Sequence, residues 1–146
     1  MKRFKFRLQV VLEMRENELE KRRIEMAKVL AVLHQQEEEL RNIISAKKQN
    51  EDEIEGLYES DTLDIQSLES HRAYGIKLTI DEQNQNRRIA NTKAILEKKQ
   101  EEVHEAHKKA EILKKLKERQ EKEYYKAFLD AEIKETDDIT TARFNR

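Results

Sequence analysis

The sequence predicts an all-α protein, an elongated antiparallel two-helix coiled-coil hairpin. The first observation is an apolar residue at every seventh position from 12 to 54 except Lys47: Leu12, Leu19, Met26, Leu33, Leu40 and Ile54. That period is typical of a helix supercoiled against another helix. Second, 42% of the 146 residues are charged, 5% are aromatic and none is proline, a composition typical of long helices. Third, the residues that favour turns are concentrated between Gly56 and Gly75.

The first long helix is predicted over residues 4–58. Its apolar stripe is completed at three- and four-residue offsets by Leu8, Val29, Ile43 and Leu57. The same register also places polar side chains on the stripe, namely Arg15, Arg22, Gln36 and Asn50. We therefore expect an imperfect, loosely held seam between the helices.

The connector is predicted over residues 59–79. Gly56, the Ser60-Asp61-Thr62 cluster and Gly75 supply its turn chemistry. Two starts of the second helix stay open: Asp61 with Asp64 three positions later, and Thr79 with Glu82, which has the capping-box pattern. A short helix inside the connector is compatible with either start.

The second long helix is predicted over residues 80–135, followed by a C-terminal tail over 136–146. Its seven-residue series runs through Ile89, Leu96, Val103 and Ala110. Folding about the connector would bring Ala106 and Ala110 opposite Val29, Leu30 and Leu33, a small-against-large arrangement that permits close approach. Residues 1–146 then form a single coiled-coil domain.

Composition and motifs favour an interaction protein and disfavour an enzyme. A net charge of −1 gives no bulk attraction to nucleic acid, so no nucleic-acid partner is expected. The longest apolar run, Val29–Leu33, is far shorter than the roughly 20 residues that cross a bilayer. His104 and His107 lie three apart but lack the HExxH pattern, and no phosphate-binding loop occurs, so no metal, cofactor or catalytic residue is expected.

Aromatic and basic residues gather near the two termini. The aromatic ones are Phe4, Phe6, Tyr124, Tyr125, Phe128 and Phe144. They are expected either to dock a partner or to seal the frayed end of the coiled coil. Lys2, Arg3, Lys5 and Arg7 precede any acidic residue, and an acidic partner surface or a solubilising tail would explain them.

Three segments resemble one protein family when taken in order. They are the opening Phe4-x-Phe6-x-Leu8-Gln9-x-x-Leu12-x-x-Arg15-Glu16, the segment His71-Arg72-Ala73-Tyr74-Gly75-Ile76-Lys77-Leu78, and the close Leu116-Lys117-Glu118-Arg119-Gln120 with Thr136-Asp137-Asp138-Ile139 and Arg143-Phe144. With these segments the whole chain resembles the FliJ family of flagellar type III export proteins. The family fold is a coiled-coil hairpin that resembles the central stalk of rotary ATPases.

The resemblance implies a non-catalytic component that docks in the hexameric flagellar export ATPase ring and promotes its assembly and activity. Together with charge, it assigns ring docking to Phe4, Lys5, Phe6, Arg7, Leu8, Arg15, Tyr124, Tyr125 and Phe128. It assigns contact with the export gate protein FlhA to Tyr74 and Leu78. It further implies an escort role for export chaperones, and a cytoplasmic location at the flagellar base, associated with the inner face of the cell membrane through partners only.

Two alternatives remain open. A holdase chaperone or scaffold could use the apolar stretch Val29–Leu33 to bind clients. Injectisome-type secretion systems also have small coiled-coil counterparts, although the terminal motifs favour the flagellar one.

Overall fold

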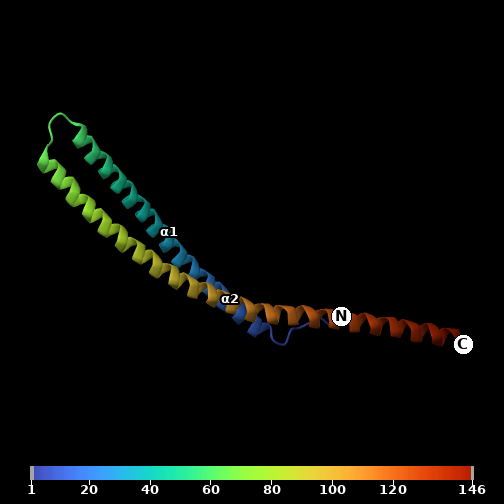
Figure 1. Cartoon of the computed structure of the whole chain (residues 1–146). Helices are drawn as coiled ribbons and strands as arrows, with labels where there is room; N and C mark the ends of the chain where they lie inside the picture. The colour runs from blue at the N-terminus through green and yellow to red at the C-terminus, as the bar shows by residue number, and fades with distance from the viewer. Residues whose placement is uncertain (1, 146) are drawn as a thin grey trace. The chain divides into compact units, whose positions relative to one another are not determined.

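The chain folds into two helices that form an antiparallel, all-α hairpin, as predicted. The computed structural model describes residues 2–145, with α1 spanning Gln9–Glu59 and α2 spanning Ile65–Phe144. Contacts divide the chain into two compact units, in each of which α1 and α2 run side by side (Figure 1). The connector unit is Arg23–Glu101, and the terminal unit combines the chain up to Arg22 with the chain from Glu102 onward. Neither helix has a stretch apolar and long enough to cross a lipid bilayer.

The turn between the helices is much shorter than the predicted connector. It occupies only Ser60–Asp64, so the prediction of a connector over 59–79 and of a helix start at 80 is wrong. The Asp64 carboxylate caps α2, accepting hydrogen bonds from the backbone N–H groups of Gln66 at 3.1 Å and Ser67 at 3.3 Å. The Thr79 hydroxyl instead donates to the Gly75 carbonyl at 3.0 Å inside α2, so the capping-box pattern there marks no helix start.

Both chain ends also differ from prediction. α1 begins at Gln9 and not at residue 4. The preceding segment is not helical, contains the buried Phe6, and turns into the helix through a hydrogen bond of 3.1 Å from the Gln9 N–H to the Phe6 carbonyl. α2 continues to Phe144, through most of the tail predicted over 136–146. Nothing in that stretch breaks a helix, since it contains neither glycine nor proline.

The seam of the terminal unit is apolar. Leu12 is buried, and Leu19 packs with Ala106 and Ala110, with Val103 half-buried against them. The predicted pairing of these alanines with Val29, Leu30 and Leu33 is therefore wrong. Pairing in an antiparallel hairpin depends on where the turn lies, and a turn centred closer to the N-terminus pairs the alanines with an earlier part of α1.

The seam of the connector unit mixes apolar and polar side chains. Its buried apolar residues are Leu33, Leu68, Leu78 and Ile89, and its buried polar residues are Asn50, Gln85 and Thr92. The Asn50 amide donates to the His71 carbonyl at 2.9 Å, and the Gln85 amide donates to the Gln36 carbonyl at 2.8 Å. These bonds join side chains of one helix to the backbone of the other, so they specify the pairing register.

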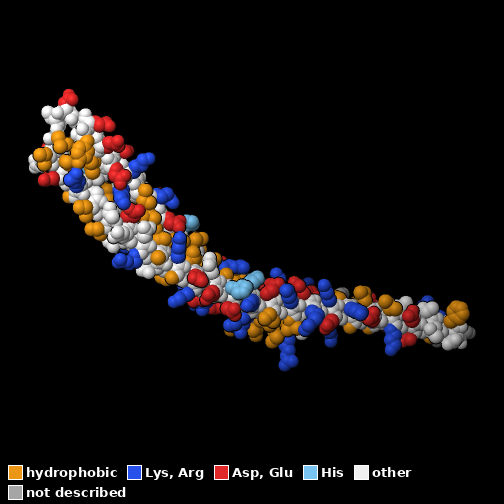
Figure 2. All heavy atoms as spheres, in the orientation of Figure 1, with side chains coloured by type: hydrophobic (Ala, Val, Ile, Leu, Met, Phe, Trp, Pro, Cys, Tyr) orange, Lys and Arg blue, Asp and Glu red, His pale blue; other side chains and the backbone are white. Residues whose placement is uncertain are grey.

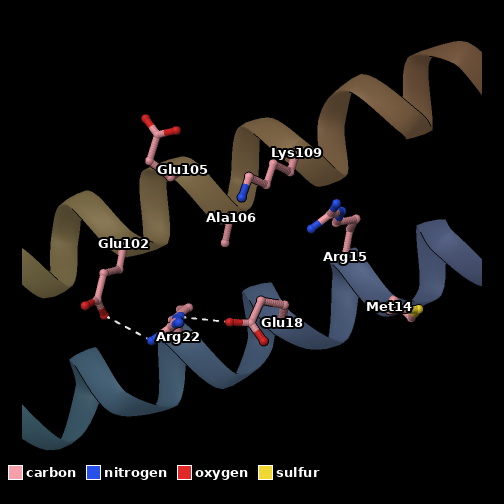
Figure 3. A pocket seen from close by; sticks show the side chains of 8 residues that line it. All are labelled: Met14, Arg15, Glu18, Arg22, Glu102, Glu105, Ala106 and Lys109. Carbon is pink, nitrogen blue, oxygen red and sulfur yellow. Dashed lines mark hydrogen bonds and ion pairs between the residues drawn. The ribbon is translucent and has the colours of Figure 1, made fainter.

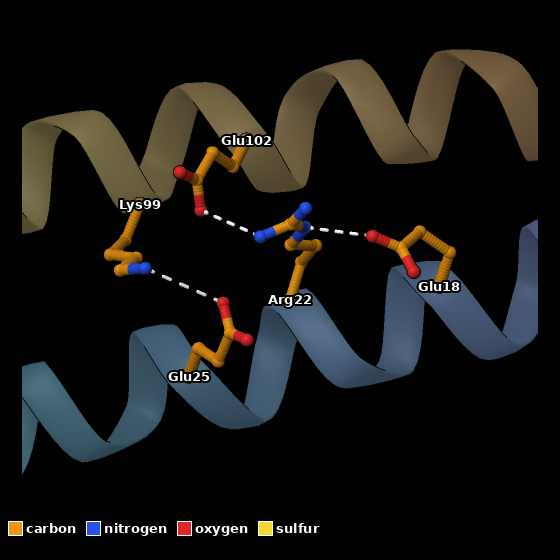
Figure 4. Close-up of polar contacts among 5 residues, drawn as sticks. All are labelled: Glu18, Arg22, Glu25, Lys99 and Glu102. Atoms are coloured by element: carbon orange, nitrogen blue, oxygen red, sulfur yellow. Dashed lines mark hydrogen bonds and ion pairs between the residues drawn. The ribbon is translucent and has the colours of Figure 1, made fainter.

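Ion pairs flank both seams. In the connector unit, Lys47 pairs with Glu82 at 3.0 Å. Lys99 pairs with Glu25 at 3.4 Å, as Figure 4 shows. In the terminal unit, Arg22 contacts both Glu18 at 2.9 Å and Glu102 at 3.3 Å. Arg22 thus lies at the predicted seam position, with its charge neutralised by carboxylates of both helices.

Candidate docking surfaces

An aromatic cluster joins the N-terminal segment to α2 in the terminal unit. The rings of Phe4 and Tyr124 lie 5.6 Å apart, and the rings of Tyr124 and Tyr125 lie 5.5 Å apart, edge to face. The Tyr124 hydroxyl also donates a hydrogen bond to the Lys2 carbonyl. The structure therefore brings together residues that are more than a hundred positions apart in the sequence. Their rings lie at the distances and angles that aromatic pairs prefer.

The other residues predicted for ring docking surround this cluster. Lys5, Arg7 and Leu8 are exposed, whereas Phe6 is buried. On α2, Tyr125 is exposed and Phe128 is half-buried. A side chain that is buried can position this surface but cannot contact a partner, so Phe6 supports the segment and its exposed neighbours offer the contacts.

Arg15 lies outside the seam in which its register placed it. It is exposed and lines a notch of about 370 Å³ between α1 and α2, formed because Ala106 is small. Figure 3 shows the side chains of Arg15 and Lys109 directed toward this gap from opposite helices. Neighbouring Arg22 has two carboxylate partners, so its charge is offset, and Arg15 with Lys109 supply the positive charge of the notch.

Tyr74 and Leu78, predicted to contact the export gate, occupy different environments in the connector unit. Tyr74 is 45% exposed, whereas Leu78 is only 5% exposed and belongs to the seam. Leu78 therefore packs between the helices and offers no surface to a partner. Only Tyr74 of the two is available for contact.

Sequence reasoning missed an apolar groove in the connector unit, and Tyr74 is not among the residues that line it. The groove has a volume of about 560 Å³ and is lined on α1 by Ile54 and on α2 by Gly75, Ile76 and Ile80. Ile76 and Ile80 are exposed and lie four positions apart on one face of α2. Hydrophobic side chains gather near the turn in Figure 2, in keeping with this groove. The signal in the sequence was the pair Ile76 and Ile80, four positions apart and next to a glycine. It was missed because Ile76 fell within the predicted connector over 59–79, which was not expected to continue the long helix.

Gly75 lies within α2 because its lack of a side chain makes room for Asn50. A Cβ at Gly75 would lie 3.1 Å from the Asn50 amide nitrogen, closer than most such contacts. Gly56 in α1, by contrast, has nothing within 4 Å of the corresponding position. Gly75 is thus a close-approach site between helices, and not the turn that its position in the sequence suggested.

His71 cross-links the helices next to the turn. Its Nδ1 lies 2.8 Å from the Ser67 carbonyl, and its Nε2 lies 2.9 Å from the Glu53 carboxylate on α1. Both partners are acceptors, and only the protonated ring donates from both nitrogens. The hydrogen bond to Ser67, and after it the bond to Glu53, raises the pKa of His71 above its ordinary value of 6.5. Arg72 adds a second cross-link, donating to the Tyr58 hydroxyl at 2.7 Å.

The exposed side chains described above are presented by a coiled-coil hairpin. Among residues 2–145, no group of three or more His, Asp or Glu side chains is arranged to hold a metal ion. The structure thus defines an all-α protein of the antiparallel coiled-coil hairpin class.

The family of this protein follows from comparison with known families. The family described as Flagellar FliJ protein matches residues 4–146, nearly the whole chain. The chain belongs to the FliJ family, which supplies non-catalytic components of the flagellar protein export apparatus. Searches of curated proteins and of solved structures gave no significant match.

Proposed function

We propose that this protein is the stalk-like subunit of the flagellar export ATPase complex, with the terminal unit docking in the hexameric ATPase ring. Family membership supports association with the export apparatus. The observation that carries the proposal is the aromatic cluster of Phe4, Tyr124 and Tyr125, which holds the N-terminal segment on α2 and leaves its cations exposed. Docking promotes ring assembly and ATP hydrolysis without the hairpin taking part in the chemistry.

The cations give the docking surface its charge. Lys5, Arg7 and Arg15 are exposed and have no role in the seam, so they are free to meet an acidic surface of the ring. The exposed apolar contacts beside them are Leu8 and Tyr125. A charged rim around aromatic anchors is the usual composition of a specific protein interface.

The test is ATPase stimulation by a triple charge-reversal variant, Lys5→Glu, Arg7→Glu and Arg15→Glu. We expect stimulation of the export ATPase, and assembly of its ring, to be abolished while helicity by circular dichroism is unchanged. The matched control reverses three exposed lysines of the connector unit, Lys28, Lys48 and Lys93, and should stimulate as the unmodified protein does. Full stimulation by the terminal variant would contradict docking through this surface.

The connector unit is proposed to contact the export gate protein FlhA, which would link the ATPase ring to the membrane gate. The exposed Tyr74 ring, and on another face of α2 the groove with Ile76 and Ile80, offer apolar area for such a contact. Leu78 acts here by holding α2 in the seam. The protein would then work in the cytoplasm at the flagellar base, reaching the inner face of the cell membrane only through its partners.

Binding to the cytoplasmic part of FlhA tests this contact. Tyr74→Ala and the pair Ile76→Ser with Ile80→Ser should each weaken FlhA binding and leave ATPase stimulation intact, because none of these residues belongs to the terminal unit. The Leu78→Ala variant should instead lower thermal stability. Equal loss of FlhA binding and ATPase stimulation in the Tyr74 variant would contradict two separate contact surfaces.

Handling of unfolded or chaperone-bound clients is a second candidate function. Leu30 and Val32 are exposed large apolar residues on α1, which favours a holdase or chaperone-escort activity. Suppression of the aggregation of unrelated proteins, lost in the variant Leu30→Ser with Val32→Ser, would support a holdase. Binding restricted to flagellar export chaperones would support the escort role instead.

A further inference from the structure

The C-terminal part of α2 has no neighbouring helix within the described chain. Every residue from 129 to 145 is exposed. The contacts that join the N-terminal segment to α2 involve Tyr124, through Phe4 and the Lys2 carbonyl, and precede this stretch. Most of the stability of protein helices comes from packing of an apolar face, so a fully exposed helix that persists to Phe144 points to a packing partner.

This stretch carries an apolar stripe on a face of its own. Tyr125, Leu129 and Ile133 follow one another at intervals of four, which places them on one side of the helix. Leu129 is 55% exposed and Ile133 is 59% exposed. They line a shallow groove of about 670 Å³ together with Lys122, Lys126 and Asp130 among other charged residues. Hydrophobic side chains are visible along this part of α2 in Figure 2.

The stripe does not continue the seam that faces α1. That seam passes through Tyr124, and its heptad would continue to Ala131 and Asp138, neither of which is a large apolar residue. The stripe therefore starts where the seam ends, and it lies on a different face of α2 from the seam. A helix that extended the α1 side of the seam would therefore not cover the stripe.

The charges beside the stripe divide into two halves of opposite sign. Residues 114–126 contain six basic and three acidic side chains, a net charge of +3. Residues 129–144 contain two basic and five acidic side chains, a net charge of −3. Two copies of this segment that run antiparallel place the basic half of each against the acidic half of the other. Two parallel copies would place like charges together.

We propose that this stripe is the interface of an antiparallel self-association between two copies of the chain. The acidic half, residues 129–144, of one copy lies along the basic half, residues 114–126, of the second. The two-fold axis passes near Leu129, so that Tyr125 of each copy packs near Ile133 of the other and the same contact forms twice. This goes beyond the proposed function, because the occupant is a second copy and not the ATPase ring. It also makes self-association and ring docking exclusive, since both use Tyr125.

The test uses charge reversal in the full-length chain, followed by sedimentation equilibrium over a range of concentrations. The unmodified protein should dimerise reversibly, and the dimer should weaken as salt screens the charges. Lys122→Glu with Lys126→Glu, and separately Glu132→Lys with Glu135→Lys, should each weaken dimerisation by about tenfold or more, because like charges then face each other. All four side chains are exposed, so the monomer fold is unaffected.

Rescue identifies the antiparallel arrangement. The two reversal variants, mixed in equal amounts, should form a heterodimer, and a single chain with all four reversals should dimerise again. The matched control, Lys93→Glu with Lys98→Glu, reverses two exposed lysines of the connector unit and should dimerise as the unmodified protein does.

Three results would overturn the proposal. One is a monomer at every concentration. Another is dimerisation that survives both reversals, or reversal variants that fail to pair when mixed. The third is that Leu129→Asp with Ile133→Asp leaves the sedimentation of the isolated chain unchanged but weakens binding to the export ATPase, which would assign the stripe to the ring.

Discussion

The seams of the two units have different chemistry. In the terminal unit, Leu19 packs on Ala106 and Ala110, and no polar side chain is buried among the described residues of that unit. In the connector unit, Asn50 and Gln85 are buried and bond to the backbone of the opposite helix. Apolar burial supplies most of the free energy of folding, whereas a buried polar residue restricts which register satisfies its hydrogen bonds. Both seams bury apolar side chains, but only the connector seam also buries polar ones, so the comparison assigns the choice of register chiefly to the connector seam.

The largest expected effect is on the terminal seam. Leu19→Ala removes a side chain that is 8% exposed from its contacts with two alanines, which are too small to fill the space. We expect the free energy of unfolding to fall by about 2–4 kcal/mol, measured by urea denaturation. Val10→Ala is the control, since Val10 is 69% exposed, and should change stability by less than about 0.5 kcal/mol. Equal losses in the two variants would contradict apolar burial in the terminal seam as the source of the effect.

The two glycines provide a smaller, matched test of the connector unit. Gly56→Ala should raise the free energy of unfolding by about 0.5–1 kcal/mol, because alanine favours a helix and meets nothing there. Gly75→Ala makes the same exchange but forces the Asn50 amide away from the His71 carbonyl, at a cost of about 1 kcal/mol for the weakened hydrogen bond. Its stability should therefore lie clearly below that of Gly56→Ala in the same denaturation assay. Identical gains would show that the close approach has no energetic weight.

The smallest expected effect is a pH dependence specific to the connector unit. Because the folded state raises the pKa of His71 above 6.5, its contribution to stability is fully present below pH 6.5 and is lost as the pH rises through the raised value. The melting temperature should thus fall slightly more between pH 6 and pH 8 in the unmodified protein than in His71→Gln. Glu53→Gln should give an intermediate slope, because the hydrogen bond from His71 to the Ser67 carbonyl remains, whereas His104→Gln, on an exposed surface, should keep the original slope. A slope unaffected by His71→Gln would exclude this cross-link as its source.

Much of the hairpin was predictable because seven-residue periodicity reports burial directly. Leu12, Leu19 and Leu33 were predicted on the seam and are buried, and Asn50 occupies the seam position that its register gave it. Leu8 is one exception, since it precedes α1 and is exposed, and Arg15 is another. It occupies a seam register but is exposed, because a long charged side chain at the edge of a narrow seam can turn into water.

The position of the turn was not predictable from local patterns. Gly75 and the Thr79 capping-box pattern have the residue types of a break, yet both lie within α2, where Gly75 accommodates Asn50 from the other helix. A close approach between helices and a turn use the same residue, and only the tertiary contact distinguishes them. The misplaced turn also produced the wrong alanine pairing and concealed the groove of Ile76 and Ile80.

The brevity of the turn has a consequence for the order in which the hairpin folds. The His71 to Glu53 contact spans 18 residues, the Gln85 to Gln36 contact 49, and the Tyr124 to Lys2 contact 122. Each step outward from Ser60–Asp64 closes only a short additional loop once the preceding contacts exist, so the entropy lost at each step is small. We therefore expect the helices to zip together from the turn. The polar register contacts form early and fix the alignment, and the aromatic cluster at the termini closes last and opens first.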